Sequence, residues 1–366
     1  MELRQAVGSL MVVGLNGAEL TGLERAWLKV VRPAGIILFR RNIETAPQTR
    51  ALLDAATAFT APAALRCVDL EGGSVDRLRA ALAPMPSAQA VARAMRKKPA
   101  LATEHGTLVA RAVRCFGLNT TLAPVLDLGL AASASVMGSR TAGETPEEVA
   151  NYAQAFVAAL SAAGVVSCGK HFPGLGGGTL DSHQATPSIE RTMRTLWQQD
   201  LAPYRALRDQ LPMVMISHAA YPQTAGKQRP ASVSRYWIEA VLRKRIGYQG
   251  LVFSDDLEMG GILNFMRIEE AAVEAIRAGM DLIEICHSPE LILRAFEALL
   301  AEGERSSSFR KLLLARAART QRLRAKFFAA HTEKSPTPKQ TEALAERICA
   351  FAEKVERLQP AGEVQA

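Results

Sequence analysis

The feature that most constrains the fold is a repeated alternation of short apolar runs with helical patterns. The runs are largely unbroken by polar residues, as expected for parallel strands buried on both faces. The eight candidate strands are Ser9–Gly14, Gly35–Phe39, Leu65–Leu70, Leu122–Asp127, Val165–Lys170, Met213–His218, Leu251–Asp255 and Asp281–Cys286. Helical patterns between them include Leu20–Val31, Thr49–Phe59, Glu147–Ala163, Leu196–Arg208, Arg235–Ile246 and Glu269–Ala278. Eight strand–helix units predict an α/β fold, a single (β/α)8 barrel of the TIM type.

A doubly wound open sheet is the alternative architecture. It usually opens with a Gly-rich phosphate loop, and the first run, GSLMVVGLNG, lacks that spacing. Glycines at or just before strand starts predict helices that end in a left-handed residue: Gly35, Gly117, Gly164, Gly250 and Gly279. Polar residues gather at the opposite strand ends, which meet on the active face of a barrel: Arg40, Asp69, Asp127, Lys170, His171, Ser217, His218, Asp255, Asp256 and His287.

The 366 residues are enough for one large domain or two of ordinary size. We expect the catalytic barrel to span residues 1–330. Residues 331–366 are expected to form a linker, with Ser-Pro-Thr-Pro at 335–338, and a helix that packs on the barrel or extends from it. The chain therefore predicts a barrel with extra C-terminal helices.

The composition is that of a globular enzyme, with 48% hydrophobic and 22% charged residues. The cysteines are dispersed without a CxxC pair, which favours reduced thiols and gives no spacing for zinc: Cys67, Cys115, Cys168, Cys286 and Cys349. The N-terminus lacks a signal-peptide pattern, and no apolar run is long enough to span a membrane. We expect a cytoplasmic protein with no metal, no cofactor and no membrane insertion, and the oligomeric state is left open.

The formal net charge of +8 is concentrated in part near the C-terminus. The basic residues there are Arg310, Lys311, Arg316, Arg319, Arg322, Arg324 and Lys326. A solvated helix face is the simpler interpretation. A nucleic-acid surface is the alternative, but no binding motif or aromatic platform accompanies the charge, so no nucleic-acid partner is expected.

The stretch KHFPGLGGGTLDSHQATP, from Lys170 to Pro187, begins at a strand end and continues as a Gly-rich loop. Residues two apart in an extended loop project to the same side, so Asp181 can approach the imidazole of His183. A carboxylate-oriented histidine is a plausible general acid/base near neutral pH. Taken alone, a DSH tripeptide would more often be a surface turn.

Two further stretches carry carboxylates at strand ends. GLVFSDDLEMGG delivers Asp255 and Asp256 to the active face. One of them can act as a nucleophile on a sugar or stabilise an oxocarbenium ion, and the other is expected to cap the next helix or to pair with a lysine. CVDLEGGSVDRLR places Asp69 before a tight Gly72–Gly73 turn, with Arg77 able to reach back over the pocket. Helix capping and a salt-bridged turn are the respective structural alternatives.

Together these motifs, with LAPVLDL, resemble glycoside hydrolase family 3. The resemblance is greatest to its bacterial β-N-acetylglucosaminidase branch, which trims cell-wall fragments during peptidoglycan recycling. It runs in order from about residue 8 to residue 330. It implies that Asp255 is the nucleophile, that His183 is the acid/base and that Asp181 is its partner. It also implies that the sugar unit is held by Asp69, Arg77, Arg140, Lys170 and His171.

Three positions depart from the family pattern. Leu175 stands where KHFPGHG has its second histidine, and in GSRTAG Ser139 and Ala142 replace an acidic and an aromatic residue. They bear on loop geometry and on the preference for the aglycone, the group attached to the released sugar.

The resemblance predicts a retaining exo-β-N-acetylglucosaminidase that works through a covalent glycosyl-enzyme on a small saccharide or muropeptide. A β-glucosidase or β-xylosidase of the same family is the nearest alternative. A non-catalytic sugar-binding relative is a further one. The sequence leaves open whether the aglycone is an anhydro-muropeptide or a chito-oligosaccharide, and whether water or phosphate is the acceptor.

Overall fold

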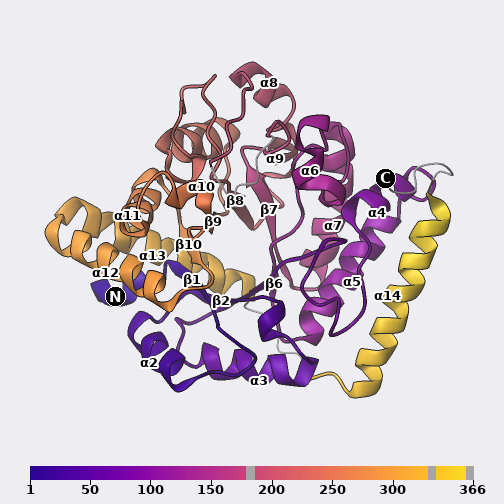
Figure 1. Ribbon diagram of the computed structural model, residues 1–366, viewed down its shortest axis with the longest axis horizontal. Coiled ribbons are helices and arrows are strands. Elements are labelled where there is room, and N and C mark those ends of the chain that lie inside the picture. Colours follow the sequence, from indigo (N-terminus) through magenta and orange to yellow (C-terminus); the bar gives the residue numbers. More distant parts are fainter. Residues whose placement is uncertain (179–185, 329–334, 360–366) are drawn as a thin grey trace.

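The computed structural model describes residues 1–178, 186–328 and 335–359. Within these ranges, eight parallel strands close into one barrel in the order β1-β10-β9-β8-β7-β6-β3-β2 (Figure 1). The strands are β1 (Met11–Gly14), β2 (Gly35–Leu38), β3 (Leu65–Val68), β6 (Thr120–Thr121), β7 (Val166–Phe172), β8 (Met213–Ile216), β9 (Leu251–Asp256) and β10 (Leu282–Ile285). Strand β1 closes the ring by pairing with both β10 and β2. The predicted (β/α)8 barrel is confirmed.

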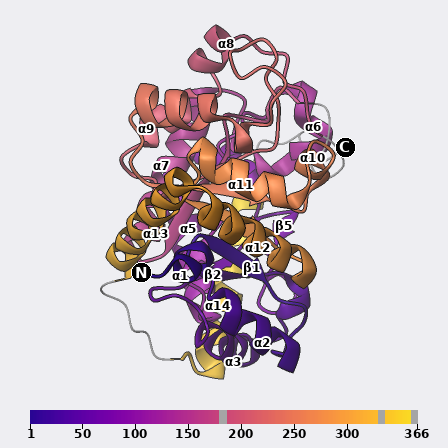
Figure 2. The same cartoon turned by 90° about the vertical axis from the view of Figure 1, so that its left-hand side faces the viewer.

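Helices surround the barrel, and α11, α12 and α13 lie next to one another on one side of it (Figure 2). The α-helices are α1 (Leu3–Gly8), α2 (Gly22–Val31), α3 (Ala46–Thr57), α4 (Ala88–Met95), α5 (Leu101–Cys115), α6 (Ala134–Met137), α7 (Pro146–Ala162), α8 (Met193–Gln198), α9 (Ala202–Leu207), α10 (Gly260–Leu263), α11 (Ile268–Ala278), α12 (Pro289–Arg305), α13 (Ser307–Phe328) and α14 (Pro338–Leu358). Short 3-10 segments are η1 (Arg40–Asn42), η2 (Ala131–Ser133), η3 (Gly138–Arg140) and η4 (Ala231–Val233), and η5 (Tyr236–Ile246) is a π-helix. A small hairpin, β4 (Leu70–Gly72) with β5 (Val75–Asp76), follows β3.

One predicted strand and one predicted helix are wrong in position. The apolar run Leu122–Asp127 is not a regular strand, and β6 lies before it. Beyond β6 the pairing continues only as an isolated bridge from Val125 to Lys170 and as irregular backbone hydrogen bonds to β3 and β7. Pro124 interrupts the run because it has no N–H to donate to a neighbouring strand. The helix predicted over Leu196–Arg208 is broken into α8 and α9, with Pro203 in the first turn of the second.

The left-handed glycines are predicted correctly at three positions, Gly117, Gly164 and Gly279. The prediction is wrong for Gly250, because η5 ends at Gly247 with φ 84°. It is also wrong for Gly35, because α2 ends at the left-handed Arg32. Both misassigned glycines instead allow close packing: a Cβ at Gly35 would lie 2.4 Å from the Leu65 carbonyl oxygen.

The C-terminal half of α13 lies over the N-terminal mouth of the barrel. Its Leu323 and Phe327 pack against the side chains that fill the lumen, among them Val12, Leu65, Cys168, Met213 and Phe253. The basic residues of α13 therefore do not form one solvated face. Arg316 and Arg319 contact the buried Asp281 at the start of β10, and Arg324 is wholly buried.

The last helix, α14, packs along α4 and α5 and adds apolar side chains to the outer core (Figure 1). All five cysteines lie in the described ranges without a disulfide, and four of them are buried. None of the helices in the described residues combines the length and apolarity that a membrane span requires.

Candidate active site

A buried lysine joins two carboxylates at the C-terminal face of the barrel. The Nζ of Lys170, at the end of β7, lies 2.8 Å from Asp69 Oδ1 and 2.6 Å from Glu71 Oε1. Burial alone would raise the pKa of Asp69, but the charges of Lys170 and then Arg77 hold it well below its usual range. The two carboxylates are therefore ionised and fixed in position before any substrate binds.

Arg140 completes this ion network from η3. Its Nε and Nη2 donate to the two carboxylate oxygens of Glu71 at 2.8 and 2.9 Å. Burial opposes ionisation of Glu71, yet Arg140 and then Lys170 lower its pKa to about 2. Sequence reasoning did not assign Glu71. The available signal was its spacing of two from Asp69 in DLEGG, which puts both side chains on one side of an extended segment.

His171 is oriented by a buried carboxylate from the loop after β6. Its Nδ1 lies 2.7 Å from Asp127 Oδ2, and its Nε2 lies 3.4 Å from Arg140 Nη2. Because a guanidinium can only donate, Nε2 accepts, and the proton of the neutral ring is on Nδ1, from which it is donated to Asp127. Asp127, which sequence reasoning placed at a strand end without a role, thus sets the tautomer.

Arg77 reaches Asp69 from the β4–β5 hairpin. Its Nη2 lies 3.3 Å from Asp69 Oδ2, and its guanidinium sits 5.6 Å from the centre of the Phe39 ring. The hairpin turns at Gly72 and Gly73, both with positive φ, as the sequence predicts. Both of the sequence interpretations therefore hold in part: Asp69 is salt-bridged, and Arg77 extends over it.

Asp255 lies at the end of β9 on the same face. Its Oδ1 accepts the backbone N–H of Asp256 at 3.0 Å, which fixes the direction of the carboxylate. On β10, the strand that pairs with β9, Glu284 is a buried carboxyl group. Burial, and then the charges of Asp256, Asp69 and Asp255, raise the pKa of Glu284 well above its usual value. The network and Asp255 therefore share one electrostatic environment.

The predicted pair Asp181 and His183 lies outside the described residues. The described ends of their loop are both anchored near the site. The backbone N–H of Leu175 donates to Asp127 Oδ1 at 2.6 Å, and Thr186 Oγ1 donates to the Gly261 carbonyl, beyond the end of β9, at 2.6 Å.

A second carboxylate, that of Asp200, packs closely against the backbone at the start of this loop. Asp200, between α8 and α9, is buried, and a Cβ added at Gly174 would lie 2.7 Å from its Cβ. Arg191, beyond the loop, approaches Asp200 to 3.4 Å and packs over Gly177. Burial raises the pKa of Asp200 to about 6, because Arg191 offsets only part of the desolvation.

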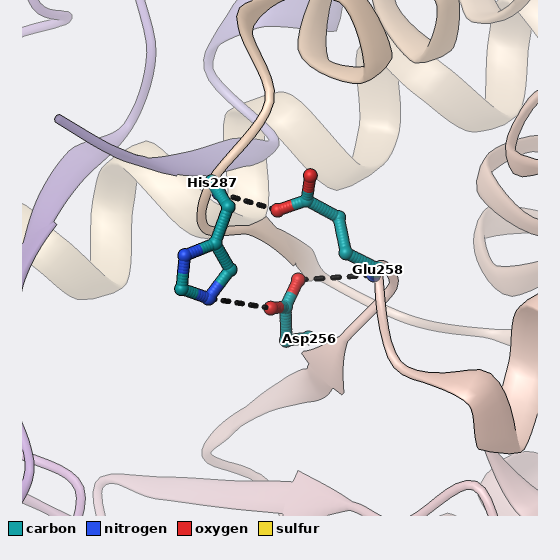
Figure 3. Close-up of side chains that lie close together, drawn as sticks. All are labelled: Asp256, Glu258 and His287. Carbon is teal, nitrogen blue, oxygen red and sulfur yellow. Dashed lines mark hydrogen bonds and ion pairs between the residues drawn. The ribbon is translucent and has the colours of Figure 1, made fainter. Parts of the chain in front are cut away.

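Asp256, Glu258 and His287 lie close together, with atoms of the kind that bind metals within 4.8 Å of one another (Figure 3). The Glu258 carboxylate already accepts the backbone N–H groups of Cys286, His287 and Ser288. Arg41 adds a positive charge 3.0 Å from His287 Nδ1, so the ring proton is on Nε2, which faces Asp256 at 3.7 Å. The geometry is that of a hydrogen-bonded network joining the ends of β9 and β10.

Within this network, burial and then the Glu258 carboxylate raise the pKa of Asp256 to about 7. The two adjacent aspartates, Asp255 and Asp256, therefore differ in their contacts. Asp256 is tied to His287 and to the backbone of Glu258, whereas Asp255 is bound only by the N–H of its neighbour among the described contacts.

The structure shows where the side chains lie at the three positions that depart from the family pattern. Leu175 acts through its backbone N–H and buries its side chain in the core beside the site. Ala142 is also buried in that core, and Ser139 is partly exposed next to Arg140.

Comparison with known proteins places the chain in a family. The model of the glycosyl hydrolase family 3 N-terminal domain matches residues 2–322. A beta-hexosaminidase of Alkalilimnicola ehrlichii is 39% identical over 291 residues, 78% of this chain and 82% of that protein. A beta-hexosaminidase of Pseudomonas aeruginosa is 37% identical over 340 residues, 92% of this chain and 96% of that protein.

Solved structures agree with these matches. A family 3 β-N-acetylglucosaminidase from Paenibacillus sp. str. FPU-7 superposes with a TM-score of 0.84 at 34% identity, covering 96% of this chain and 69% of that one. Native NagZ from Neisseria gonorrhoeae superposes with a TM-score of 0.75 at 29% identity, covering 96% of this chain and 98% of that one. The chain therefore belongs to glycosyl hydrolase family 3.

Proposed function

We propose that this chain, a glycoside hydrolase of the β-N-acetylhexosaminidase type, removes β-linked N-acetylglucosamine from the non-reducing ends of glycans with retention of configuration. Its family and its beta-hexosaminidase relatives support the reaction class. The observation that supports the site is the preorganised network of Asp69, Glu71, Lys170 and Arg140 on the same face as Asp255. Peptidoglycan fragments are the proposed source, on the resemblance of the motifs to the cell-wall-recycling branch.

Asp255 is the proposed nucleophile. Its Oδ1 is held by the Asp256 N–H, which leaves Oδ2 to attack the anomeric carbon. As the glycosidic bond breaks, His183, with Asp181 as its partner, protonates the leaving oxygen. Water then gives its proton to His183 and attacks the same carbon, which releases the sugar and restores the Asp255 carboxylate.

The charged network is the proposed binding site for the sugar hydroxyls. Asp69 accepts hydrogen bonds, while Lys170 and the guanidiniums of Arg77 and Arg140 donate them. His171 is held in one orientation against Asp127. Because the ion pairs already fix these groups, the sugar is oriented with little further loss of side-chain entropy.

Trapping with a fluorinated slow substrate tests the nucleophile. We expect mass mapping to place a glycosyl ester on Asp255 and Asp255→Ala to abolish turnover with unchanged thermal unfolding. Asp256→Asn is the matched control and should still be labelled. A label on another side chain would refute the assignment.

Two rate comparisons test the acid/base and the substrate. His183→Ala should slow substrates with poor leaving groups more than activated aryl glycosides, because good leaving groups need less protonation. The wild type should favour nitrophenyl β-N-acetylglucosaminide over the β-glucoside, and the reverse preference would support the β-glucosidase alternative. Product masses from cell-wall fragments and chitobiose then identify the natural aglycone.

A further inference from the structure

A buried arginine lies at the end of the barrel opposite the active site. Arg324, on the part of α13 that covers the N-terminal mouth, is 0% exposed. Its Nη1 donates to the carbonyl oxygens of Ala34, Pro62 and Ala63 at 3.0, 2.9 and 3.0 Å. Among the described residues, its Nε and Nη2 have no hydrogen-bond acceptor. An unsatisfied buried donor is costly, so these two groups are expected to meet an acceptor.

Arg324 carries its charge without a neighbouring carboxylate in the described structure. Burial, the cause of the shift, lowers its pKa to about 10, which leaves it charged at neutral pH. The other two arginines that α13 turns toward the barrel, Arg316 and Arg319, both contact Asp281. Arg324 therefore differs from them in having a free hydrogen-bonding edge and no counter-ion.

A cavity of about 320 Å³ adjoins this arginine. Its lining consists of Met1, Gln5, Ser9, Arg32, Ala61, Pro62, Gln321 and Arg324, with no acidic residue. Arg32, exposed at the end of α2, supplies a second cation and has no ion-pair partner among the described contacts. The cavity thus combines two positive charges with the hydroxyl of Ser9 and the amides of two glutamines.

The surroundings are also positive. A neighbouring cavity of about 650 Å³ shares Arg32, Ala61 and Pro62 with the first. Its lining adds three arginines, Arg50, Arg66 and Arg114, and one acidic residue, Asp54, which is already paired with Arg66. Such a concentration of one sign of charge raises the local concentration of anions.

We propose that the cavity beside Arg324 binds a phosphate dianion. The Nε–H and Nη2–H groups of a guanidinium form a fork that matches two oxygens of such a group, and Arg32 supplies the second charge. Both nitrogens are shielded from solvent, and the exposed Gln5 and Gln321 line the same cavity as Arg324. This site lies at the opposite end of the barrel from Asp255 and does not depend on the proposed reaction.

Isothermal titration of the full chain with inorganic phosphate, at constant ionic strength and near neutral pH, tests the site. We expect one equivalent to bind in the presence of saturating N-acetylglucosamine, which occupies the active face. Arg32→Gln, at an exposed position, should weaken binding on the order of tenfold or more through the loss of a charged hydrogen bond. Arg324→Lys, which retains the charge but not the fork, should weaken it by a similar factor.

Arg322→Gln is the matched control, since Arg322 is exposed on the same helix and does not line the cavity. It should bind phosphate as the wild type does. Acetate, which fits the same fork with one charge, should bind more weakly than phosphate. The proposal is overturned by any of three results: no binding by the wild type, equal affinity in the Arg32 and Arg322 variants, or loss of binding when N-acetylglucosamine is saturating. Acetate binding as tight as phosphate would overturn the assignment to a dianion.

Discussion

Glu71 and Arg140 are joined by two hydrogen bonds, at 2.8 and 2.9 Å, in an ion pair that comes from two separate loops of the barrel and whose carboxylate is buried. The same carboxylate also binds Lys170. Removal of the Glu71 charge would leave the buried Lys170 and the partly buried Arg140 with less compensating negative charge. The pair therefore links the stability of the active face to its binding geometry.

Glu71→Gln tests this link. We expect a fall in kcat/KM on the order of 100-fold and a loss of about 3 kcal/mol in the free energy of unfolding, because breaking a buried pair leaves charge uncompensated. Activity on nitrophenyl β-N-acetylglucosaminide and urea unfolding measure the two effects. Glu148→Gln, which removes a surface pair with Arg96, is the control and should change both by little. Wild-type kcat/KM in Glu71→Gln would contradict the role.

Asp127→Asn should damage the site through His171. Asp127 accepts from the His171 backbone, the His171 ring and the Leu175 backbone, whereas an asparagine turns an NH₂ group toward one of these donors. The cost of such a mismatch, about 1–3 kcal/mol, corresponds to a loss of about 5- to 150-fold in kcat/KM. Steady-state kinetics checks this, with the exposed Asp209→Asn as control. Equal kinetics in the two variants would show that the tautomer does not matter.

Asp200→Asn should alter how stability depends on pH. The pKa of Asp200 is raised from 3.8 to about 6 in the folded chain, so its contribution to stability is complete below 3.8 and is lost as the pH rises through 6. The variant lacks this loss. As the pH rises from below 3.8 to above 6, the free energy of unfolding of the variant should gain about 3 kcal/mol relative to that of the wild type. Urea unfolding on either side of this window measures the difference, and parallel pH curves would contradict it.

Asp281→Asn should loosen the attachment of α13. Asp281 is buried and contacts Arg243, Arg316 and Arg319. We expect a loss of about 3–5 kcal/mol in the free energy of unfolding, because three guanidiniums lose their shared anion. Well below the unfolding temperature, kcat/KM should stay close to that of the wild type, since this cluster is at the far end of the barrel. Asp54→Asn, at an exposed pair with Arg66, is the control and should cost less than about 1 kcal/mol. A similar small loss in both variants would refute the cluster's role.

The barrel could be predicted from the sequence because strands buried on both faces are short apolar runs with little else in them. The prediction of a strand at Leu122–Asp127 was wrong because it rested on the same criterion, an apolar run. An apolar run gives no account of which backbone groups are paired, and Pro124 removes a donor from the middle of that one. The break between α8 and α9 at Pro203 is the corresponding case among the helices.

The candidate site was predicted in part. Asp69, Arg77, Arg140, Lys170 and His171 do meet in the fold, within one set of ion pairs and hydrogen bonds. Glu71 and Asp127 were not assigned because each acts through a partner far along the chain, 69 and 44 residues away, and such a separation leaves no local pattern. The prediction that the basic stretch of α13 is a solvated face was wrong for the same reason. Arg316 pairs with Asp281, which lies 35 residues earlier in the chain.

Leu175 meets Asp127 with its peptide nitrogen and not with its side chain. Every amino acid except proline has a backbone N–H group, so this hydrogen bond can form with almost any residue at position 175. The side chain, by contrast, is packed in the hydrophobic core, where its volume can be altered without breaking this hydrogen bond. The residue at position 175 can therefore change while the start of the loop stays bound to the same carboxylate that orients His171.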